Sequence, residues 1–303
     1  MARIEHHFSA MGGPCRLRVD SENEPAARSA IHSAEDEVRR LERKYSRYLP
    51  DSLTSKINRL AGGESFVTID EETAGLLNYA QTLWRESDGL FDLTSGVLRR
   101  AWDFKSSRLP QQEELDSLLS LVAWDRVEWD ATSVRLPDKG MELDFGGCVK
   151  EYACDSAAAV LRRANIESAL VDLSGDIAAV GVQASGEAWQ IGIRHPGKKA
   201  GAIAHIPLAC GGLASSGNYE RFMELNGRRY GHIINPKSGW PVQGLVAVSA
   251  LADQCLVAGS TATIAMLMPA PEALVWLDGL GISWLAVDTR FNIHGTIDVS
   301  GHE

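Results

Sequence analysis

Two hydrophobic periods alternate irregularly along this chain, and their mixture restricts the fold more than any other feature. Between Pro25 and Tyr48 the apolar residues fall three or four positions apart, which is typical of an amphipathic helix. Residues 189–194 instead alternate large apolar side chains with Gln, Gly and Arg, which is typical of a half-buried strand. Because the two periods follow no regular βαβ order, we expect a mixed α/β (α+β) fold with largely antiparallel sheets and flanking helices.

The same two patterns assign further segments. Helices are expected near Asp70, which can cap the first of them, and over 111–121, Glu151–Ala164 and Asp253–Met268. Strands are expected over 14–20, Met141–Phe145, Ser168–Leu173, His232–Ile234, Val246–Leu251, Ser283–Val287 and Asn292–Val299.

The length and composition describe a folded chain with a substantial core. Its 303 residues are 45% hydrophobic and 23% charged, which argues against disorder. No repeat of fixed period and no long Pro/Ser-rich linker marks a boundary. We therefore expect residues 1–303 to fold as one large domain, or as two interleaved lobes.

The charge balance and the apolar runs exclude two classes of partner. A net charge of -10 is the opposite of the basic surface that a sequence-independent nucleic-acid binder needs, although a local site can still bind an anion. No apolar run reaches the roughly 20 residues of a membrane helix. We therefore expect neither a nucleic-acid nor a membrane partner.

The cysteines indicate the compartment. The five of them are scattered and form no CxxC pair, so neither a zinc site nor a disulfide framework is indicated. The first residues, MARIEHHFSAMGG, carry charge and histidines where a secretory signal would be apolar. Unpaired thiols suit a reducing compartment, so we expect a cytoplasmic protein.

Glycines and ionisable residues cluster where the expected elements join, in segments 86–96, 143–155, 215–241 and 257–262. The Gly146-Gly147 turn lets backbone approach a ligand, and the helix after it directs N–H groups at an anion, where Lys150 can meet phosphate charge. Each segment alone is more simply explained by a structural turn or by core packing. A single histidine such as His232 is also more often structural than catalytic.

Together, the order and spacing of these segments resemble the FAD:protein FMN transferase (ApbE) family over nearly the whole chain. Asp144–Asp155 is similar to the family's Asp-Leu-Gly-Gly-Ile-Ala-Lys-Gly-Tyr-x-x-Asp, and Gly89–Thr94 to its Gly-Ala-Phe-Asp-Pro-Thr. Ser216–Tyr219 and His232–Pro236 are similar to Ser-Gly-x-Tyr and His-Ile-Ile-Asp-Pro. Weaker matches are found at Ala10–Gly12, Ser46–Tyr48, Ser52 and Ile57–Asn58.

The resemblance implies an ApbE-like fold and a transferase that flavinylates proteins. Members of the family split FAD with Mg²⁺, attach the FMN half to a threonine or serine of a flavoprotein, and release AMP. It implies FAD as substrate and an unidentified acceptor flavoprotein as partner. Contacts with FAD are implied for Met11, Tyr48, Leu90, Phe91, Asp92, Asp144, Lys150, His232, Ile233 and Ile234.

The resemblance also assigns individual roles. Tyr48 and Phe91 would offer apolar ring faces to the flavin or adenine. His232 becomes the candidate for proton transfer. The Mg²⁺ ion would be held by the backbone carbonyl of Gly147 and by Thr261.

Several positions depart from the family pattern. Val257 stands where the family has a metal-binding aspartate, and Glu151 replaces the glycine after Lys150. Ser174 and Asn235 replace a glycine and an aspartate. A catalytically impaired FAD-binding carrier or assembly protein therefore stays an alternative, as does an FAD pyrophosphatase. The family's targets carry Asp-x-x-Ser/Thr-Gly followed by two small or hydroxyl residues. Residues 92–98 begin in this way but end in Val97 and Leu98, so self-modification is not expected.

Overall fold

Three separated stretches of the chain build one unit of the structure, and two further stretches build another. The computed structural model describes residues 2–104, 108–197, 201–219 and 222–299. The first unit consists of residues 1–42, 148–217 and 244–303, and the second of residues 43–147 and 218–243. Neither unit is a continuous stretch of sequence, so each is held together by contacts between distant segments.

The first unit contains an eight-stranded sheet in which every neighbouring pair is antiparallel. Across the sheet its strands are β1 (Ala2–Ala10), β2 (Gly13–Ser21), β6 (Ala169–Leu173), β7 (Asp176–Val180), β10 (Gly211–Gly217), β13 (Leu245–Ala252), β14 (Ser283–Asp288) and β15 (Ile293–Gly295). The expected antiparallel pairing is confirmed.

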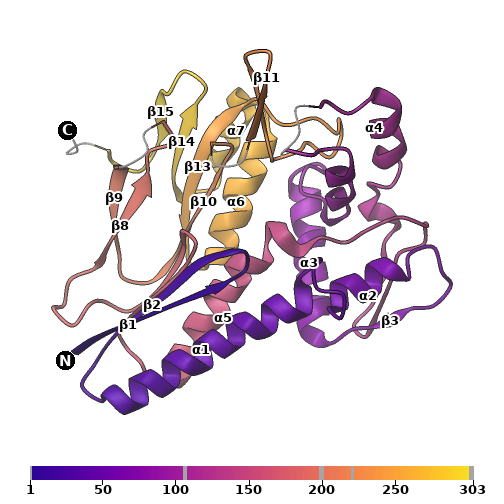
Figure 1. Ribbon diagram of the computed structural model, residues 1–303. Coiled ribbons are helices and arrows are strands. Elements are labelled where there is room, and N and C mark those ends of the chain that lie inside the picture. Colours follow the sequence, from indigo (N-terminus) through magenta and orange to yellow (C-terminus); the bar gives the residue numbers. More distant parts are fainter. Residues whose placement is uncertain (1, 105–107, 198–200, 220–221, 300–303) are drawn as a thin grey trace. The chain divides into compact units, whose positions relative to one another are not determined.

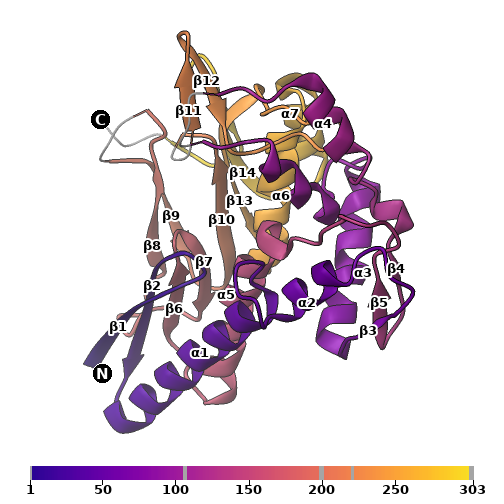
Figure 2. The same ribbon diagram turned by 45° about the vertical axis from the view of Figure 1, so that its right-hand side comes forward.

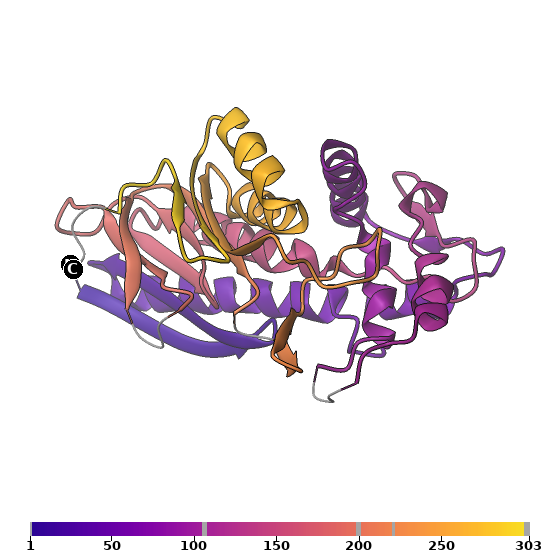
Figure 3. The same cartoon turned by 90° about the horizontal axis from the view of Figure 1, so that it is seen from above.

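Helices cover one face of this sheet (Figures 1 and 2). α5 (Val149–Arg163) packs against β6 and β7, and α6 (Cys255–Leu267) packs against β10, β13 and α5. α6 is buried on nearly every side, as its continuous apolar composition requires. α7 (Ala270–Gly279) follows α6 and contacts β14, and Figure 3 shows both helices together from above.

The two faces of β1 have different neighbours because strand side chains alternate. His6 points to α1 (Glu24–Tyr45), where its Nε2 lies 2.5 Å from Glu35. Arg3 points the other way, and its guanidinium lies 5.0 Å from the ring centroid of Trp189. Trp189 begins β8 (Trp189–Arg194), which pairs with β9 (Ala202–Leu208). This hairpin therefore lies on the face of β1 opposite α1.

The second unit is mainly helical. Its helices are α2 (Leu53–Arg59), α3 (Glu71–Glu86) and α4 (Gln112–Leu119), with the 3₁₀ turns η1 (Leu93–Arg100), η2 (Trp124–Arg126) and η3 (Phe145–Gly147). Its small sheets contain β3 (Val67–Thr68), β4 (Glu128–Trp129), β5 (Ser133–Arg135), β11 (Phe222–Leu225) and β12 (Arg228–Gly231). A cluster of Ala101, Trp102, Leu115, Met223 and Tyr230 forms the core that joins its two stretches of chain.

The predicted helices are confirmed, with shifted ends. Asp70 does cap α3, because its side chain accepts the Thr73 N–H at 3.0 Å. The predicted strand at Met141–Phe145 is wrong, since these residues enter no ladder and end in η3. The last strand is shorter than predicted, because β15 covers only Ile293–Gly295. Within the described ranges, no helix is long and apolar enough to cross a bilayer.

Candidate functional site

The residues singled out in the sequence divide between the two units. Met11, Lys150 and Thr261 belong to the first unit. The second unit holds Tyr48, Leu90, Phe91, Asp92, Asp144, Gly147, His232, Ile233 and Ile234. The structure therefore groups these residues into two sets, each with its own contacts.

The Ser46–Tyr48 turn presents an aromatic ring to solvent. Ser46 Oγ accepts the Tyr48 N–H at 3.2 Å, and Ser52 caps α2 by accepting the Ser55 N–H at 2.9 Å. Tyr48 is 77% exposed, so a ring face is available for a planar ligand. Beside it, Arg47 Nη2 donates to Tyr48 Oη at 2.8 Å, and Arg47 Nη1 donates to Asp144 Oδ2.

Asp144 lies in a loop that is held by side-chain bonds and one backbone bond, not by a sheet ladder. The Asn58 side chain donates to the Leu143 carbonyl at 2.9 Å and accepts the Leu143 N–H at 2.7 Å. The Asp144 N–H donates to the Leu93 carbonyl at 2.9 Å, and its Oδ1 accepts the Gly146 N–H at 2.9 Å. These bonds occupy the groups that a strand would have paired, which explains why the predicted strand does not form.

The ring of Phe91 is not an open surface. It is only 4% exposed, and a Cβ built on Gly147 would lie 3.4 Å from its edge. The expected ring face at Phe91 is therefore not available in this structure, unlike that at Tyr48. Phe91 instead packs against Gly147, and its N–H donates to Ser87 Oγ at 2.8 Å.

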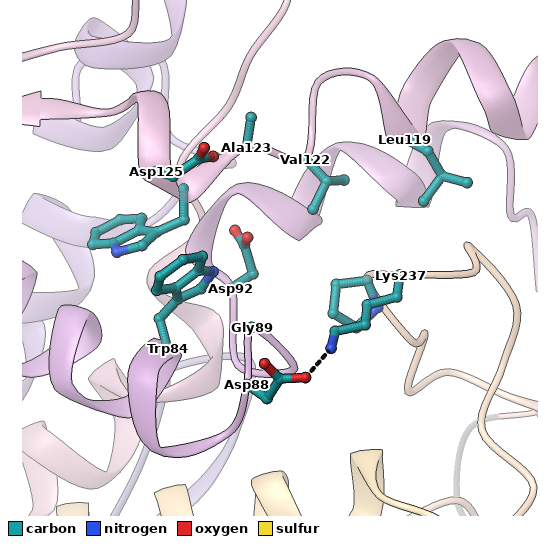
Figure 4. Close-up of a pocket in the computed structure, with 11 residues that line it drawn as sticks. Trp84, Asp88, Gly89, Asp92, Leu119, Val122, Ala123, Asp125 and Lys237 are labelled. Atoms are coloured by element: carbon teal, nitrogen blue, oxygen red, sulfur yellow. Dashed lines mark hydrogen bonds and ion pairs between the residues drawn. The ribbon is translucent and has the colours of Figure 1, made fainter.

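Asp92 lines a pocket of about 410 Å³ in the second unit (Figure 4). Burial raises the pKa of Asp92, while bonds from the Thr94 N–H at 2.7 Å and Thr94 Oγ1 at 2.5 Å oppose that rise. At the rim, Lys237 Nζ lies 2.6 Å from Asp88. The pocket is lined by Trp84, Asp88, Gly89, Asp92, Leu119, Val122, Ala123, Trp124, Asp125, Pro236 and Lys237. It thus unites the segments 86–96 and 215–241, which the sequence singled out separately.

His232 follows β12 in an exposed bend. The strand predicted over His232–Ile234 is wrong, because Ile234 makes only an isolated bridge to Pro241. Before it, Gly231 abuts Asn218, so closely that a Cβ would lie 2.4 Å from Asn218 Oδ1. The motif around Asn218 therefore sets the path of the backbone that carries His232.

In the first unit, Met11 lies in the two-residue turn between β1 and β2. Met11 and Gly12 have φ values of 54° and 78°, which fit the type I′ turn that suits the twist of a hairpin. The Met11 N–H donates to Glu42 of α1 at 2.6 Å. The position of this residue is therefore set by backbone contacts.

Lys150, in the first turn of α5, belongs to a buried charged cluster. Its Nζ lies 2.6 Å from Asp176, and although burial lowers the pKa of Lys150, the Asp176 carboxylate raises it overall. Burial raises the pKa of Glu151 to about 8, and the negative charge of Asp176 adds to the rise. Glu151 Oε2 finds no hydrogen-bond donor among the described residues. Burial therefore favours the neutral, protonated form of Glu151, which would add no negative charge beside Lys150.

The raised pKa of Glu151 predicts how stability depends on pH. Between about pH 4.5 and 8 the folded protein holds a proton that the unfolded chain releases. The free energy of unfolding should therefore fall as the pH rises through this window, by up to about 1.4 kcal/mol per pH unit. Glu151→Gln cannot titrate and should flatten the slope in urea unfolding series, whereas the exposed control Glu167→Gln should keep it. An unchanged slope in Glu151→Gln would contradict the assignment.

The start of α6 is capped from another helix. The helix predicted from Asp253 begins at Cys255, and Gln254 occupies the N-cap position without making a side-chain cap bond. Asp155 of α5 supplies the cap instead, because its two carboxylate oxygens accept the N–H groups of Cys255 and Leu256, each at 2.9 Å. This bond explains why an aspartate ends the 144–155 segment.

The first turns of α6 offer little to a metal ion. Val257 is 38% exposed and carries no oxygen, while Thr261, four residues later on the same helix face, is 6% exposed. Glu151 does not replace the missing carboxylate, because it packs against Gly259, about 200° around the helix from Val257. Across the described ranges, no three His, Cys, Asp or Glu side chains form a metal-binding group. Mg²⁺ prefers carboxylate and other hard oxygen ligands, so this donor set does not fit it well.

Sequence reasoning missed several residues that organise the site. Arg47 stands inside a recognised motif, but its partner is 97 positions away. Trp84 carries no local signal. Asp88 and Lys237 lie in segments that the sequence singles out, but their ion pair at the rim of the pocket becomes visible only once the chain is folded.

Known proteins resemble this chain in sequence and in structure. The model of the ApbE family matches residues 11–285. An FAD:protein FMN transferase of Treponema pallidum is 31% identical, with 89% of this chain and 83% of that protein aligned. One from Rhodobacter capsulatus is 30% identical over 86% of this chain, which spans half of that relative's length.

The fold leads to the same family. The crystal structure of an ApbE protein from Thermotoga maritima superimposes with a TM-score of 0.88 and 28% identity, and the match covers 97% of each chain. The expected ApbE-like architecture is therefore confirmed. The chain belongs to the ApbE family.

Proposed function

We propose that the protein is an FAD:protein FMN transferase. It transfers the FMN half of FAD to a threonine or serine hydroxyl of a partner flavoprotein and releases AMP. The observation that carries the proposal is the convergence of the second unit's motifs. The loops 86–96 and 235–241 line one pocket, and Tyr48 is tied to Asp144. Family membership over residues 11–285 supports flavin transfer as the reaction at this site.

In the proposed reaction the acceptor hydroxyl attacks the FMN phosphorus of FAD. The new P–O bond forms as the bond to the AMP phosphate breaks, and AMP leaves with the electron pair. The exposed His232 takes the proton of the hydroxyl. Lys150 provides positive charge for the phosphate oxygens, and the ring of Tyr48 carries the flavin or adenine. Catalysis then consists of positioning and charge stabilisation, as in other phosphoryl transfers.

The remaining family positions are proposed as contacts with FAD. They are Met11, Leu90, Phe91, Asp92, Asp144, Ile233 and Ile234. Phe91 acts through the Gly147 turn that it packs against, since its own ring is buried. Mg²⁺ would have the Gly147 carbonyl and the Thr261 hydroxyl, and no carboxylate at Val257. No step of the reaction is therefore assigned to the metal.

We place the protein in the cytoplasm. None of its five cysteines forms a disulfide in the described part of the chain, and Cys15, Cys148, Cys154 and Cys255 are buried. Such thiols suit a reducing compartment. The acceptor would then be a cytoplasmic flavoprotein or the cytoplasmic part of one.

The proposal is tested with FAD and a purified flavoprotein domain. The domain carries the acceptor pattern Asp-x-x-Ser/Thr-Gly followed by two small or hydroxyl residues. We expect AMP and covalently flavinylated domain to form in equal amounts. AMP is measured by chromatography and the flavinylated domain by intact mass spectrometry. A domain with alanine in place of the acceptor residue should yield neither product. Absence of both products with every acceptor domain tried would overturn the proposal.

Val257 favours a second candidate, a flavin carrier or assembly protein that has lost the reaction. Such a protein would bind FAD equally well with and without Mg²⁺ and leave it intact. Calorimetric titration of FAD under both conditions separates the two candidates. The third candidate, an FAD pyrophosphatase, would release free FMN without any acceptor.

A further inference from the structure

Arg47 donates hydrogen bonds to both Asp144 and Tyr48, and these contacts have no assigned role. The three residues lie in the second unit, and the pair of Arg47 with Asp144 is largely buried, with side chains 19% and 21% exposed. Tyr48, by contrast, is 77% exposed. An exposed tyrosine would ordinarily sample several rotamers. The Arg47–Asp144 pair, called the anchor below, contacts Tyr48 and restricts the orientation of its ring.

The anchor is rigid at its inner end. Asp144 Oδ2 accepts from Arg47 Nη1, while Oδ1 accepts the Gly146 N–H at 2.9 Å. A Cβ on Gly96 would lie 2.5 Å from Asp144 Cβ, so the backbone of η1 fixes this carboxylate from a third side. The guanidinium is planar, so fixing one of its nitrogens restricts the direction of the other.

The outer end of the anchor holds the tyrosine in two ways. Arg47 Nη2 donates to the Tyr48 hydroxyl at 2.8 Å, and the guanidinium carbon lies 5.0 Å from the ring centroid. The second contact is a cation–π interaction on one face of the ring. Because Tyr48 stays 77% exposed, the other face remains accessible to a planar ligand.

The same anchor changes the charge of the site. Asp144 alone would repel the phosphates of a dinucleotide. Paired with Arg47 it becomes part of a neutral group, and its remaining oxygen is already bonded to backbone. Asp144 thus contributes geometry without adding a free negative charge.

From this geometry we infer that Arg47 is a positioning residue of the flavin site. It fixes the ring of Tyr48 as the platform on which a ring system of FAD stacks, and it acts through Asp144 on one side and the Tyr48 hydroxyl on the other. The inference rests on the proposed function, because the ring that stacks is that of FAD.

A double-mutant cycle tests the inference in the full chain. Arg47→Lys keeps the charge opposite Asp144 but loses the second, fixed donor, and Tyr48→Phe keeps the ring but loses the acceptor. Each change should weaken FAD binding about tenfold, the usual size for a hydrogen bond to a charged group. The double variant should also lose about tenfold, because both changes break the same bond.

Two readouts separate positioning from a general structural role. At saturating FAD, the quenching of flavin fluorescence should be weaker in both single variants, whereas the melting temperature should stay near that of the parent. The control Arg85→Lys alters an exposed arginine of the same unit and should change neither affinity nor quenching.

The outcomes distinguish this inference from the proposed function. If the parent protein binds no FAD, the proposed function fails and the role of Arg47 fails with it. If the parent binds FAD but the single variants bind equally well, or the double variant loses about a hundredfold, Arg47 is not a positioning residue and the proposed function stands.

Discussion

His232→Ala should lower the rate of FMN transfer by about 10²- to 10⁴-fold, the range that a positioned general base contributes. The side chain is exposed at a bend after β12, so its removal should affect the free energy of unfolding far less than it affects the transfer rate. The rate is measured as AMP release and as flavinylated acceptor, and FAD affinity is measured separately, so that a loss in chemistry is distinguished from a loss in binding.

The exposed His7 of β1 provides the matched control. Its side chain is 67% exposed, and His7→Ala removes the same chemical group without touching a proposed contact. It should transfer FMN at the parent rate. Retention of more than about a third of the activity in His232→Ala would rule out proton transfer by this histidine.

Val257→Asp should tighten Mg²⁺ binding to the FAD complex by about 10- to 100-fold, because it adds a carboxylate one turn before Thr261. The position tolerates the change. It is 38% exposed, and it is the third residue of α6, where negative charge is stabilised by the helix dipole. Titration calorimetry of Mg²⁺ into the protein with FAD, and AMP release against Mg²⁺ concentration, both measure the effect.

Val275→Asp makes the same change at a 74% exposed position of α7 and should leave the Mg²⁺ dependence unaltered. If Val257→Asp behaves like this control, another group already supplies the ligand. If it creates FAD cleavage that the parent lacks, the natural protein is impaired at the metal and the carrier function gains support.

The sequence predicted best where a local pattern decides the structure. The helix predicted from Pro25 shows a clear period of three to four, and α1 covers Glu24–Tyr45. Asp70 caps the helix that follows it directly in the sequence. The alternation in residues 189–194 is likewise confirmed, because Trp189, Ile191 and Ile193 are buried. In these segments the local preference and the tertiary contacts agree.

Predictions failed where a distant residue decides the structure. Met141–Phe145 alternates like a strand, yet Asn58 and Leu93 take the backbone groups of Leu143 and Asp144. Asp253 has the residue type of an N-cap, but Asp155 caps α6 from 100 positions away in the sequence. No pattern within a window of a few residues contains such a partner.

The candidate site shows the same division. Motifs located Asp92 and the turn after His232 where elements join, because glycine and proline reveal turns locally. His232 itself was predicted on a strand and lies in a bend. The motifs did not reveal that the ring of Phe91 is buried against Gly147, since that depends on how two loops stack. Nor did they reveal Arg47, whose importance comes entirely from its contact with Asp144.

Glu151 of α5 packs against Gly259 of α6, so the residue types at these two positions constrain each other. A Cβ at position 259 would lie 2.4 Å from Glu151 Cγ, so the two positions share one fixed volume. A larger residue on α6 can be accommodated only with a smaller one on α5, such as the glycine that the family pattern places at 151. A larger residue at position 259 should therefore occur only together with a smaller one at position 151, and introducing it alone should give a poorly folded protein.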